Sequence, residues 1–335
     1  MRQGAFTRNG VSRRRFLKIC AAGAAGLALP GTAIATPSLH RWSGVALGAK
    51  AEINLQLEDA ASAQRLFGLI EAEVRRLERI FSLYRQDSEL FRLNGTGKLE
   101  APSLEMVELL GLSQRLHRVT GGAFDPTVQP LWDHYARRAV GKAAASDFDT
   151  AKERTGLGGV SVEAAEIRYL KPGMAMTLNG IAQGFITDRI TALLVAEGCT
   201  DMVVDLGEVV GRGTPEDTGK LEAGWPVTLR PDANHPEGKV RISLKDKAVA
   251  SSARLGTTFD QGGTRSHILD PRSGLPVRGG LTGASVVASS AALADGLSTA
   301  ALVCGEEKLN AVLAGMPDTS AFIVRSNGTW GWLNG

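Results

Sequence analysis

Two oxygen-bearing side chains, Asp295 and Thr299, lie four residues apart in the segment 294–300. Side chains with this spacing project from the same face of a helix, so both would point in one direction. A carboxylate and a hydroxyl are hard oxygen ligands of the kind that Mg²⁺ takes, usually together with phosphate oxygens of a substrate. The same residues also occur at an ordinary polar helix start, so the pair alone leaves a metal site and a structural role open.

A single histidine, His267, lies in the segment 266–274, where a predicted strand over 266–269 runs into a turn marked by Pro271 and Gly274. We expect this turn to place His267 near the edge of a sheet. Histidine is the side chain most easily set to act as a base near neutral pH. A histidine at such a position is also compatible with a purely structural role.

Two glycine-containing segments have the composition of ligand-binding loops. The segment 121–127 begins with paired glycines, which permit positive φ and close backbone approach, and its Pro126 restricts Asp125 to an extended conformation. The segment 177–184 leads into a predicted helix, whose first N–H groups and dipole suit phosphate oxygens. The alternatives are a simple turn for the first segment and an Asn cap with tightly packed glycines for the second.

The periodicity of apolar residues predicts the elements that position these segments. A strand is expected over 45–57. Asp59 is expected to cap a helix that ends near Phe81, and a second helix follows Ser103 with Leu104 among its inward residues. Residues 120–130 are expected to form a loop, and a third helix to run from Asn179 or Gly180 to about residue 198.

The C-terminal part of the chain is predicted to consist of short strands and two helices. Strands are expected over 201–205, 225–230, 239–244, 247–251, 266–269, 281–288, 319–325 and 328–333, and helices over 290–303 and 306–314. The polar stretch 213–224 is expected to be a surface loop. Helices packed on a mostly antiparallel sheet indicate an α+β fold, and no low-complexity linker divides it.

The N-terminal residues have the pattern of an export signal. Residues 1–18 are basic, residues 19–29 are apolar, and small residues precede a predicted cleavage site after Ala35. The run Ser12–Lys18 resembles a twin-arginine signal, although a chance basic cluster before an ordinary signal is the alternative. An apolar run of this length spans roughly 16 Å, about half of a bilayer core, so we expect no stable membrane anchor.

The charge of the chain is concentrated in this signal. The sequence holds 38 Lys and Arg and 35 Asp and Glu, a formal net charge of +3, and six of the basic residues but no acidic ones fall within residues 1–35. The remaining chain is therefore mildly acidic, which argues against a nucleic-acid-binding role. With 43% apolar and 22% charged residues, the composition also excludes a disordered, collagen-like or coiled-coil protein.

Taken in order, these segments resemble the FAD:protein FMN transferases, the ApbE-type flavin transferases. The resemblance covers 43–333 and rests on five motifs: 82–89 followed by Leu93-Asn94, 121–127, Gly180-Ile181-Ala182 with Gly184 and Asp188, 267–274, and 294–299. It implies the ApbE-like tunnel-fold (T-fold) architecture, with residues 36–335 as one flavin transferase domain. The chain differs from the family pattern at Leu47-Gly48-Ala49, Thr177, Gln183 and Ser251-Ser252-Ala253.

The resemblance also implies the activity and the residues that carry it. FAD would be the substrate, and Mg²⁺-dependent cleavage of its pyrophosphate would join FMN to a threonine hydroxyl of a target flavoprotein and release AMP. The metal ligands would be the backbone oxygen of Ala182 with Asp295 and Thr299, while His267 and Asp295 would be catalytic. The positions that match the FAD site are Leu47, Tyr84, Ala123, Phe124, Asp125, Asn179, Gln183, Ser251 and Leu269.

Two alternatives share this site. One is an FAD pyrophosphatase that gives FMN and AMP with water as the acceptor, and the other is a non-catalytic periplasmic FAD-binding protein. The expected partner of the transferase is a respiratory or electron-transfer flavoprotein that carries an acceptor Thr. Export by the twin-arginine route, which moves folded proteins, predicts a periplasmic location.

Overall fold

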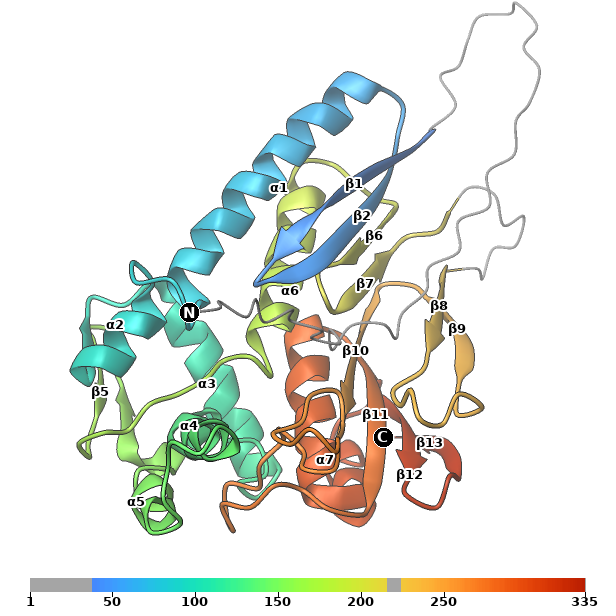
Figure 1. Cartoon of the computed structure of the whole chain (residues 1–335). Coiled ribbons are helices and arrows are strands. Elements are labelled where there is room, and N and C mark those ends of the chain that lie inside the picture. The colour runs from blue at the N-terminus through green and yellow to red at the C-terminus, as the bar shows by residue number, and fades with distance from the viewer. Residues whose placement is uncertain (1–37, 216–223, 335) are drawn as a thin grey trace, which may run out of the picture.

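A computed structural model describes residues 38–215 and 224–334 of the chain, and the predicted export signal, residues 1–35, lies outside these ranges. The largest element is an eight-stranded sheet with the strand order β1-β2-β6-β7-β10-β11-β12-β13, in which every neighbouring pair is antiparallel (Figure 1). Its strands are β1 (Ser38–Ala46), β2 (Ala49–Leu57), β6 (Met202–Asp205), β7 (Val209–Arg212), β10 (Lys247–Ala253), β11 (Leu281–Ala288), β12 (Ser320–Arg325) and β13 (Trp330–Asn334). The predicted α+β class with a mostly antiparallel sheet is confirmed.

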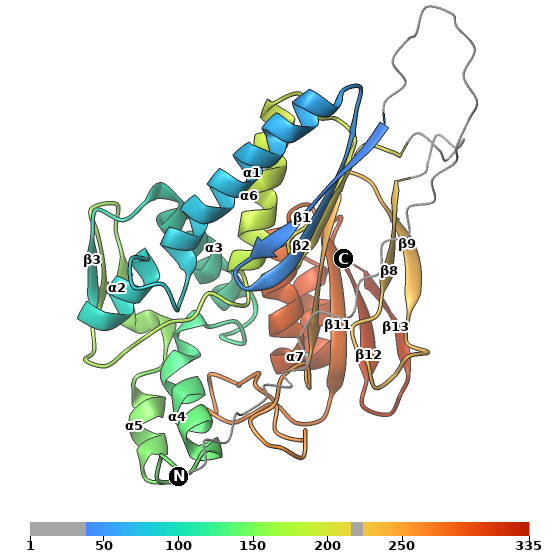
Figure 2. The same ribbon diagram turned by 45° about the horizontal axis from the view of Figure 1, so that its top comes forward.

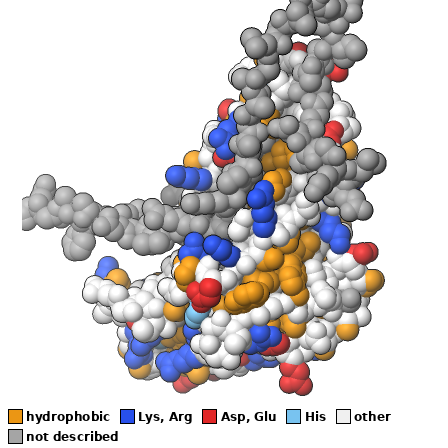
Figure 3. All heavy atoms as spheres, turned by 90° about the vertical axis from the view of Figure 1, so that its right-hand side faces the viewer, with side chains coloured by type: hydrophobic (Ala, Val, Ile, Leu, Met, Phe, Trp, Pro, Cys, Tyr) orange, Lys and Arg blue, Asp and Glu red, His pale blue; other side chains and the backbone are white. Residues whose placement is uncertain are grey.

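Helices cover one face of this sheet, and a hairpin covers part of the other. Helices α6 (Ala182–Ala196) and α7 (Ala291–Leu313) pack against each other and against β7, β10 and β11, while α1 (Ala60–Phe81) runs beside α6 (Figure 2). On the opposite face, β8 (Trp225–Leu229) and β9 (Val240–Leu244) bury a second apolar cluster against the sheet. The side of the molecule where β8, β9, β12 and β13 lie is turned to the viewer in Figure 3, and apolar side chains gather at its centre.

A smaller lobe lies beside α1 and α7, at the left of Figure 1. It contains α2 (Glu89–Thr96), α3 (Leu104–Val119), α4 (Gln129–Ala139), α5 (Asp147–Glu153) and a three-stranded sheet, in the order β3-β5-β4, of β3 (Lys98–Glu100), β4 (Val160–Val162) and β5 (Glu166–Tyr169). Two short 3-10 turns, η1 (Pro126–Val128) and η2 (Leu157–Gly159), complete it. None of the helices in the described part of the chain is long and apolar enough to cross a membrane.

The predicted helix starts depend on capping residues, and two of them are confirmed. The Asp59 carboxylate accepts a hydrogen bond from the Ser62 N–H at 2.8 Å, and the Ser103 hydroxyl accepts one from the Met106 N–H at 3.2 Å. Leu104, however, is 67% exposed, so its predicted inward position is wrong. The buried face of α3 is set instead by Met106, Leu109, Leu110 and Leu116.

The single strand predicted over 45–57 is also wrong, because the chain folds into the β1–β2 hairpin. Ala46 pairs with Ala49 across a two-residue turn. Both turn residues have positive φ, 46° at Leu47 and 76° at Gly48, as a type I′ hairpin turn requires. The turn has no Asn-Gly or Asp-Gly sequence to mark it, and the apolar alternation continues across it. The pattern therefore predicts one strand instead of two.

Other boundaries differ in ways that bear on the site. Residues 266–269 form no strand and make only isolated bridges, Thr258 to Ser266 and Leu269 to Pro276. Helix α6 begins at Ala182, two or three residues later than predicted, because residues 179–181 form a turn. The predicted loop 120–130 already contains η1 and the start of α4. The two predicted C-terminal helices are joined as α7, with a break at Gly305, where φ is 77°.

Candidate active site

One large cavity, of about 1810 Å³, lies where the smaller lobe meets α7, β10 and the β1–β2 hairpin. Its lining includes all the predicted catalytic and FAD-site residues and two of the three predicted metal ligands: Leu47, Tyr84, Ala123, Phe124, Asp125, Asn179, Gln183, Ser251, His267, Leu269, Asp295 and Thr299. Residues from distant parts of the sequence therefore converge on one space. Ala182 is not part of this lining; it is buried in the first turn of α6, between the lining residues Gly180 and Gln183.

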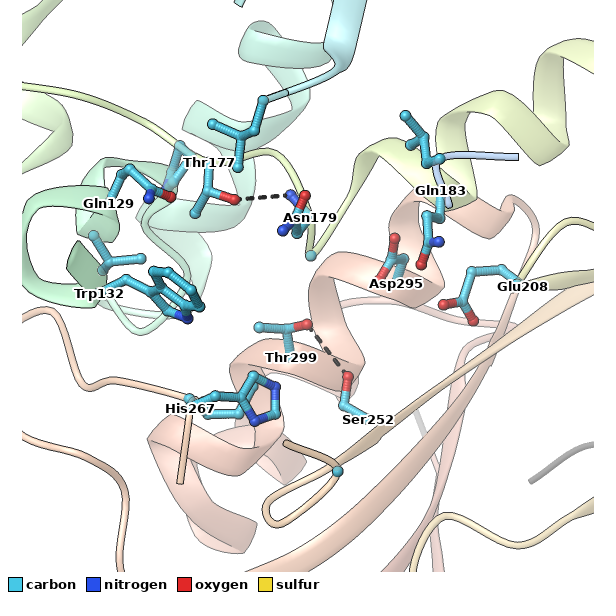
Figure 4. Close-up of a pocket in the computed structure, with 18 of the residues that line it drawn as sticks. Gln129, Trp132, Thr177, Asn179, Gln183, Glu208, Ser252, His267, Asp295 and Thr299 are labelled. Atoms are coloured by element: carbon cyan, nitrogen blue, oxygen red, sulfur yellow. Dashed lines mark hydrogen bonds between the residues drawn. The ribbon is translucent and has the colours of Figure 1, made fainter. Parts of the chain in front are cut away.

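Helix α7 presents Asp295 and Thr299 to the cavity, one turn apart (Figure 4). Asp295 is 4% exposed, and its carboxylate accepts a hydrogen bond from the Gly184 N–H at 3.2 Å. The Thr299 hydroxyl lies 3.3 Å from the Ser252 hydroxyl, which in turn lies 2.8 Å from that of Ser298. These contacts fix both side chains against α6 and β10, so the oxygens are held in place by the protein.

The loop after β10 positions His267. The His267 Nδ1 lies 2.7 Å from the carbonyl oxygen of Thr257, and the His267 backbone N–H donates to the same oxygen at 3.2 Å. Since a carbonyl can only accept, Nδ1 carries the proton and Nε2 is the basic nitrogen. In Figure 4 the His267 ring lies on the same side of the cavity as Thr299 and Ser252.

The loop 121–127 is built around the buried Asp125 carboxylate. It accepts hydrogen bonds from the backbone N–H groups of Thr127 at 2.8 Å and Leu157 at 2.9 Å, and from the Thr127 hydroxyl at 2.5 Å. Gly121 and Gly122 have positive φ, which glycine permits, and Asp125 is extended, as the sequence predicted. These contacts show that the Asp125 side chain fixes the shape of the loop that brings Ala123 and Phe124 to the cavity.

The turn before α6 brings Asn179 to the cavity without capping the helix. The Asn179 N–H donates to the Thr177 hydroxyl at 3.3 Å, and the helix has no side-chain cap at Ile181. Gly180 lies directly against Thr299, because a Cβ at this position would be 3.1 Å from the Thr299 hydroxyl oxygen. A close approach between this turn and α7 therefore explains the glycine.

The comparisons with known proteins agree with this arrangement. The model of the ApbE family matches residues 47–323. The chain belongs to the ApbE family. Curated relatives include an FAD:protein FMN transferase of Salmonella typhimurium, 26% identical over 297 residues (85% of this chain and 84% of the relative). Another, of Treponema pallidum, is 29% identical over 287 residues (79% and 77%).

Solved structures of the ApbE family have the same fold. The flavin transferase ApbE from Vibrio cholerae superposes with a TM-score of 0.76 at 24% identity, covering 88% of this chain and 96% of that one. The apo form of the Pseudomonas stutzeri flavinyl transferase ApbE gives a TM-score of 0.74 at 25% identity, covering 90% and 95%. The predicted ApbE-like architecture is therefore confirmed.

Several cavity residues of this ApbE-family chain were not predicted as site residues. Glu208 follows β6, is 6% exposed and accepts a hydrogen bond from the Ser251 N–H at 3.2 Å. Gln129 and Trp132 come from α4, a helix that the sequence analysis did not predict. The one sequence signal for α4 is the i, i+4 spacing of the apolar residues Leu131 and Tyr135. This pattern covers few residues and follows a Pro-containing stretch, so it does not predict a helix by itself.

The charged residues that line the cavity are mainly acidic. Its lining holds the acidic residues Glu52, Asp125, Asp133, Asp205, Glu208 and Asp295, whereas Lys50 is the one Lys or Arg among the described lining residues. A cleft lined by one sign of charge repels a ligand of the same sign. An anionic ligand would therefore need a cation to bind beside these carboxylates.

The donor set fits a hard cation better than a soft one. Asp295 and Thr299 offer a carboxylate and a hydroxyl oxygen, and within residues 38–215 and 224–334 no three His, Cys, Asp or Glu side chains cluster as a metal centre. Few protein ligands, all of them oxygen, suit Mg²⁺ completed by substrate phosphates.

Proposed function

We propose that this protein is a Mg²⁺-dependent FAD:protein FMN transferase that joins FMN to a threonine hydroxyl of a target flavoprotein and releases AMP. Membership of the ApbE family and relatives that carry this activity in their names support the transfer of FMN from FAD to a protein. The observation that carries the proposal is the convergence of His267, Asp295 and Thr299 on one cavity. The volume of the cavity exceeds that of a common small-molecule pocket, about 300–1,000 Å³, which leaves room for an acceptor segment beside a dinucleotide.

The chemistry follows from the positions of these side chains. The Nε2 of His267 would take the proton of the acceptor hydroxyl as its oxygen attacks the FMN phosphorus. A new phosphorus–oxygen bond forms to the threonine, and the bond between the FMN phosphorus and the bridging oxygen breaks, so AMP leaves with that oxygen. Phosphoryl transfer of this kind depends mainly on positioning and on neutralising charge.

The site residues also suit the implied metal. Asp295 and Thr299, with the backbone oxygen of Ala182, would hold Mg²⁺. When bound, it would neutralise the negative charge of the diphosphate among the surrounding carboxylates.

The test is mass spectrometry of periplasmic proteins from cells with and without the gene. We expect a threonine-linked FMN on at least one protein only when the gene is present. The purified protein should restore this adduct in the extract that lacks it when FAD and Mg²⁺ are added. AMP release at the full rate with no acceptor protein, and no adduct in either experiment, would instead indicate an FAD pyrophosphatase. FAD binding with no turnover would indicate a non-catalytic binding protein.

We further propose that residues 1–35 direct export by the twin-arginine route and that residues 36–335 act in the periplasm as one domain. Replacing Arg13 and Arg14 by Lys keeps the charge of the signal but changes the residues that a receptor would read. Cell fractionation should then find the protein retained in the cytoplasm. Unchanged periplasmic recovery of this double variant would refute the proposed route.

A further inference from the structure

Trp132 gives the cavity a flat aromatic surface. It lies in the first half of α4, is half-buried and lines the cavity. In Figure 4 its ring lies across the cavity from Asp295 and Glu208. The ring thus faces the space in which the dinucleotide of the proposed function would lie.

Packing holds this ring in place. It meets Phe259 edge to face, with ring centroids 5.6 Å apart and an interplanar angle of 61°. Phe259 in turn packs against Tyr135 at 5.5 Å, within an apolar cluster that includes Leu131 and Leu269. A side chain that is already ordered loses little conformational entropy when a ligand binds to it.

The other aromatic residues of the lining are less suited to stacking. Tyr84 is 81% exposed and Phe91 is 40% exposed, while Phe124 is buried, with only 5% of its surface accessible. Trp132 lies between these extremes: it is half-buried, packs against Phe259 and lines the cavity.

We propose that Trp132 binds a planar heteroaromatic ring of the dinucleotide by stacking and so orients that ring relative to His267. The proposal rests on the proposed function in taking FAD as the ligand. Both ends of FAD, the isoalloxazine and the adenine, have the required chemistry. Aromatic rings stack with an offset at centroid separations of about 4.5–7 Å, and base stacking on aromatic side chains contributes measurably to affinity.

The experiment compares Trp132→Leu, which keeps apolar packing but has no aromatic face, with Trp132→Phe, which keeps a smaller ring. The matched control is Trp330→Leu, because Trp330 is a half-exposed tryptophan on β13 outside the cavity lining. Calorimetric titrations with Mg²⁺ and FAD, FMN or AMP measure Kd. We expect Trp132→Leu to raise the Kd for FAD about tenfold and Trp132→Phe by no more than about threefold. The control should leave it unchanged.

The FMN and AMP titrations identify the ring. A weakened Kd for FMN alone assigns Trp132 to the isoalloxazine, and a weakened Kd for AMP alone assigns it to the adenine. A second readout compares only the wild type and Trp132→Phe. The ligand quenches indole fluorescence, and the part of this quenching that is absent in Trp132→Phe reports direct contact between the ligand and the Trp132 ring.

Two outcomes would overturn the inference, and they separate it from the proposed function. If the wild type binds FAD and transfers FMN while Trp132→Leu binds all three ligands within twofold of the wild type, only the role of Trp132 is refuted. If the wild type binds none of the three, both proposals fail.

Discussion

His267 is the residue whose chemistry the proposed reaction needs most directly. Its Nδ1–H donates to the Thr257 carbonyl oxygen, which fixes the ring with Nε2 as the basic nitrogen. We expect His267→Asn and His267→Ala to lower single-turnover transfer by about 10²–10⁴-fold, because a general base is lost. Binding of FAD with Mg²⁺ should stay within about threefold of the wild type.

The Asn variant is the sharper of the two, since its amide can still donate to the Thr257 carbonyl and hold the loop. Ser273→Ala, an exposed position in the same loop, is the control and should transfer normally. Transfer by His267→Asn at the wild-type rate would contradict the role of His267 as the base.

At the level of elements, the crossing of α6 and α7 determines where Asp295 lies. A Cβ on Gly184 would be 2.2 Å from the carbonyl oxygen of Ala291, so the two helices approach this closely only with glycine at this position. We expect Gly184→Ala to lower the free energy of unfolding by about 3 kcal/mol, because backbone atoms cannot move aside cheaply. It should also reduce transfer, since α7 carries Asp295 and Thr299.

Gly68, in the middle of α1, is the matched control. A Cβ there meets no atom within 4 Å, so Gly68→Ala should stabilise the protein by about 0.5–1 kcal/mol through its helix propensity. Chemical denaturation measures both variants. Equal effects of the two substitutions would show that the close crossing does not constrain the fold.

The start of α7 is tied to α6 by Asp188. Its carboxylate accepts hydrogen bonds from the N–H groups of Ala291 at 2.7 Å and Ala292 at 2.9 Å. Burial raises the pKa of Asp188 from 3.8 to about 6, against the lowering effect of these hydrogen bonds. The folded protein thus keeps a proton that the unfolded chain releases between these pH values. The stability that this proton provides is fully present below pH 3.8 and is lost as the pH rises through about 6.

Asp188→Asn removes this titration. Between pH 4 and pH 6.5, we expect the unfolding free energy of the wild type to fall by about 2 kcal/mol relative to that of the variant. Urea denaturation across this range measures it. A difference that stays constant with pH would mean that the Asp188 carboxylate titrates at its ordinary value in the folded protein.

The elements that the sequence predicted well have strong local signals. Asp59 and Ser103 cap helices with regular apolar spacing, and β11, which is buried along its whole length, begins and ends where predicted. Helix α4 has no comparable signal, because it is stabilised by distant contacts such as that between Tyr135 and Phe259. Because α4 was not predicted, Trp132 was not predicted as a site residue either.

The site residues could be assigned to one shared site only through the family resemblance. The i, i+4 spacing placed Asp295 and Thr299 on one helix face, but nothing local to their segment indicates that His267 lies in the same cavity. That proximity depends on the packing of the 254–274 loop against α4 and α7. Glu208 was missed for the same reason, since its burial becomes visible only when β6 and β10 are brought into one sheet.

At the scale of the whole molecule, the proposed function makes ligand binding in the acidic cavity depend on metal binding. Lys50 is the one Lys or Arg among the described lining residues, so the phosphates of the proposed substrate FAD would meet mainly carboxylates. We expect FAD with Mg²⁺ to stabilise the protein by about 2.7 kcal/mol at a hundredfold excess over Kd. FAD in EDTA should stabilise it far less, and added monovalent salt should partly restore binding there by screening the repulsion.

Asp295→Asn separates the two contributions, because it removes a proposed metal ligand and a repelling charge together. The Mg²⁺-dependent part of the stabilisation by FAD should fall in this variant, whereas binding in EDTA should equal or exceed that of the wild type. Denaturation curves with FAD, with and without Mg²⁺, measure both parts for each protein. If FAD stabilises the wild type as much in EDTA as it does with Mg²⁺, the cavity neutralises the phosphates without a metal ion.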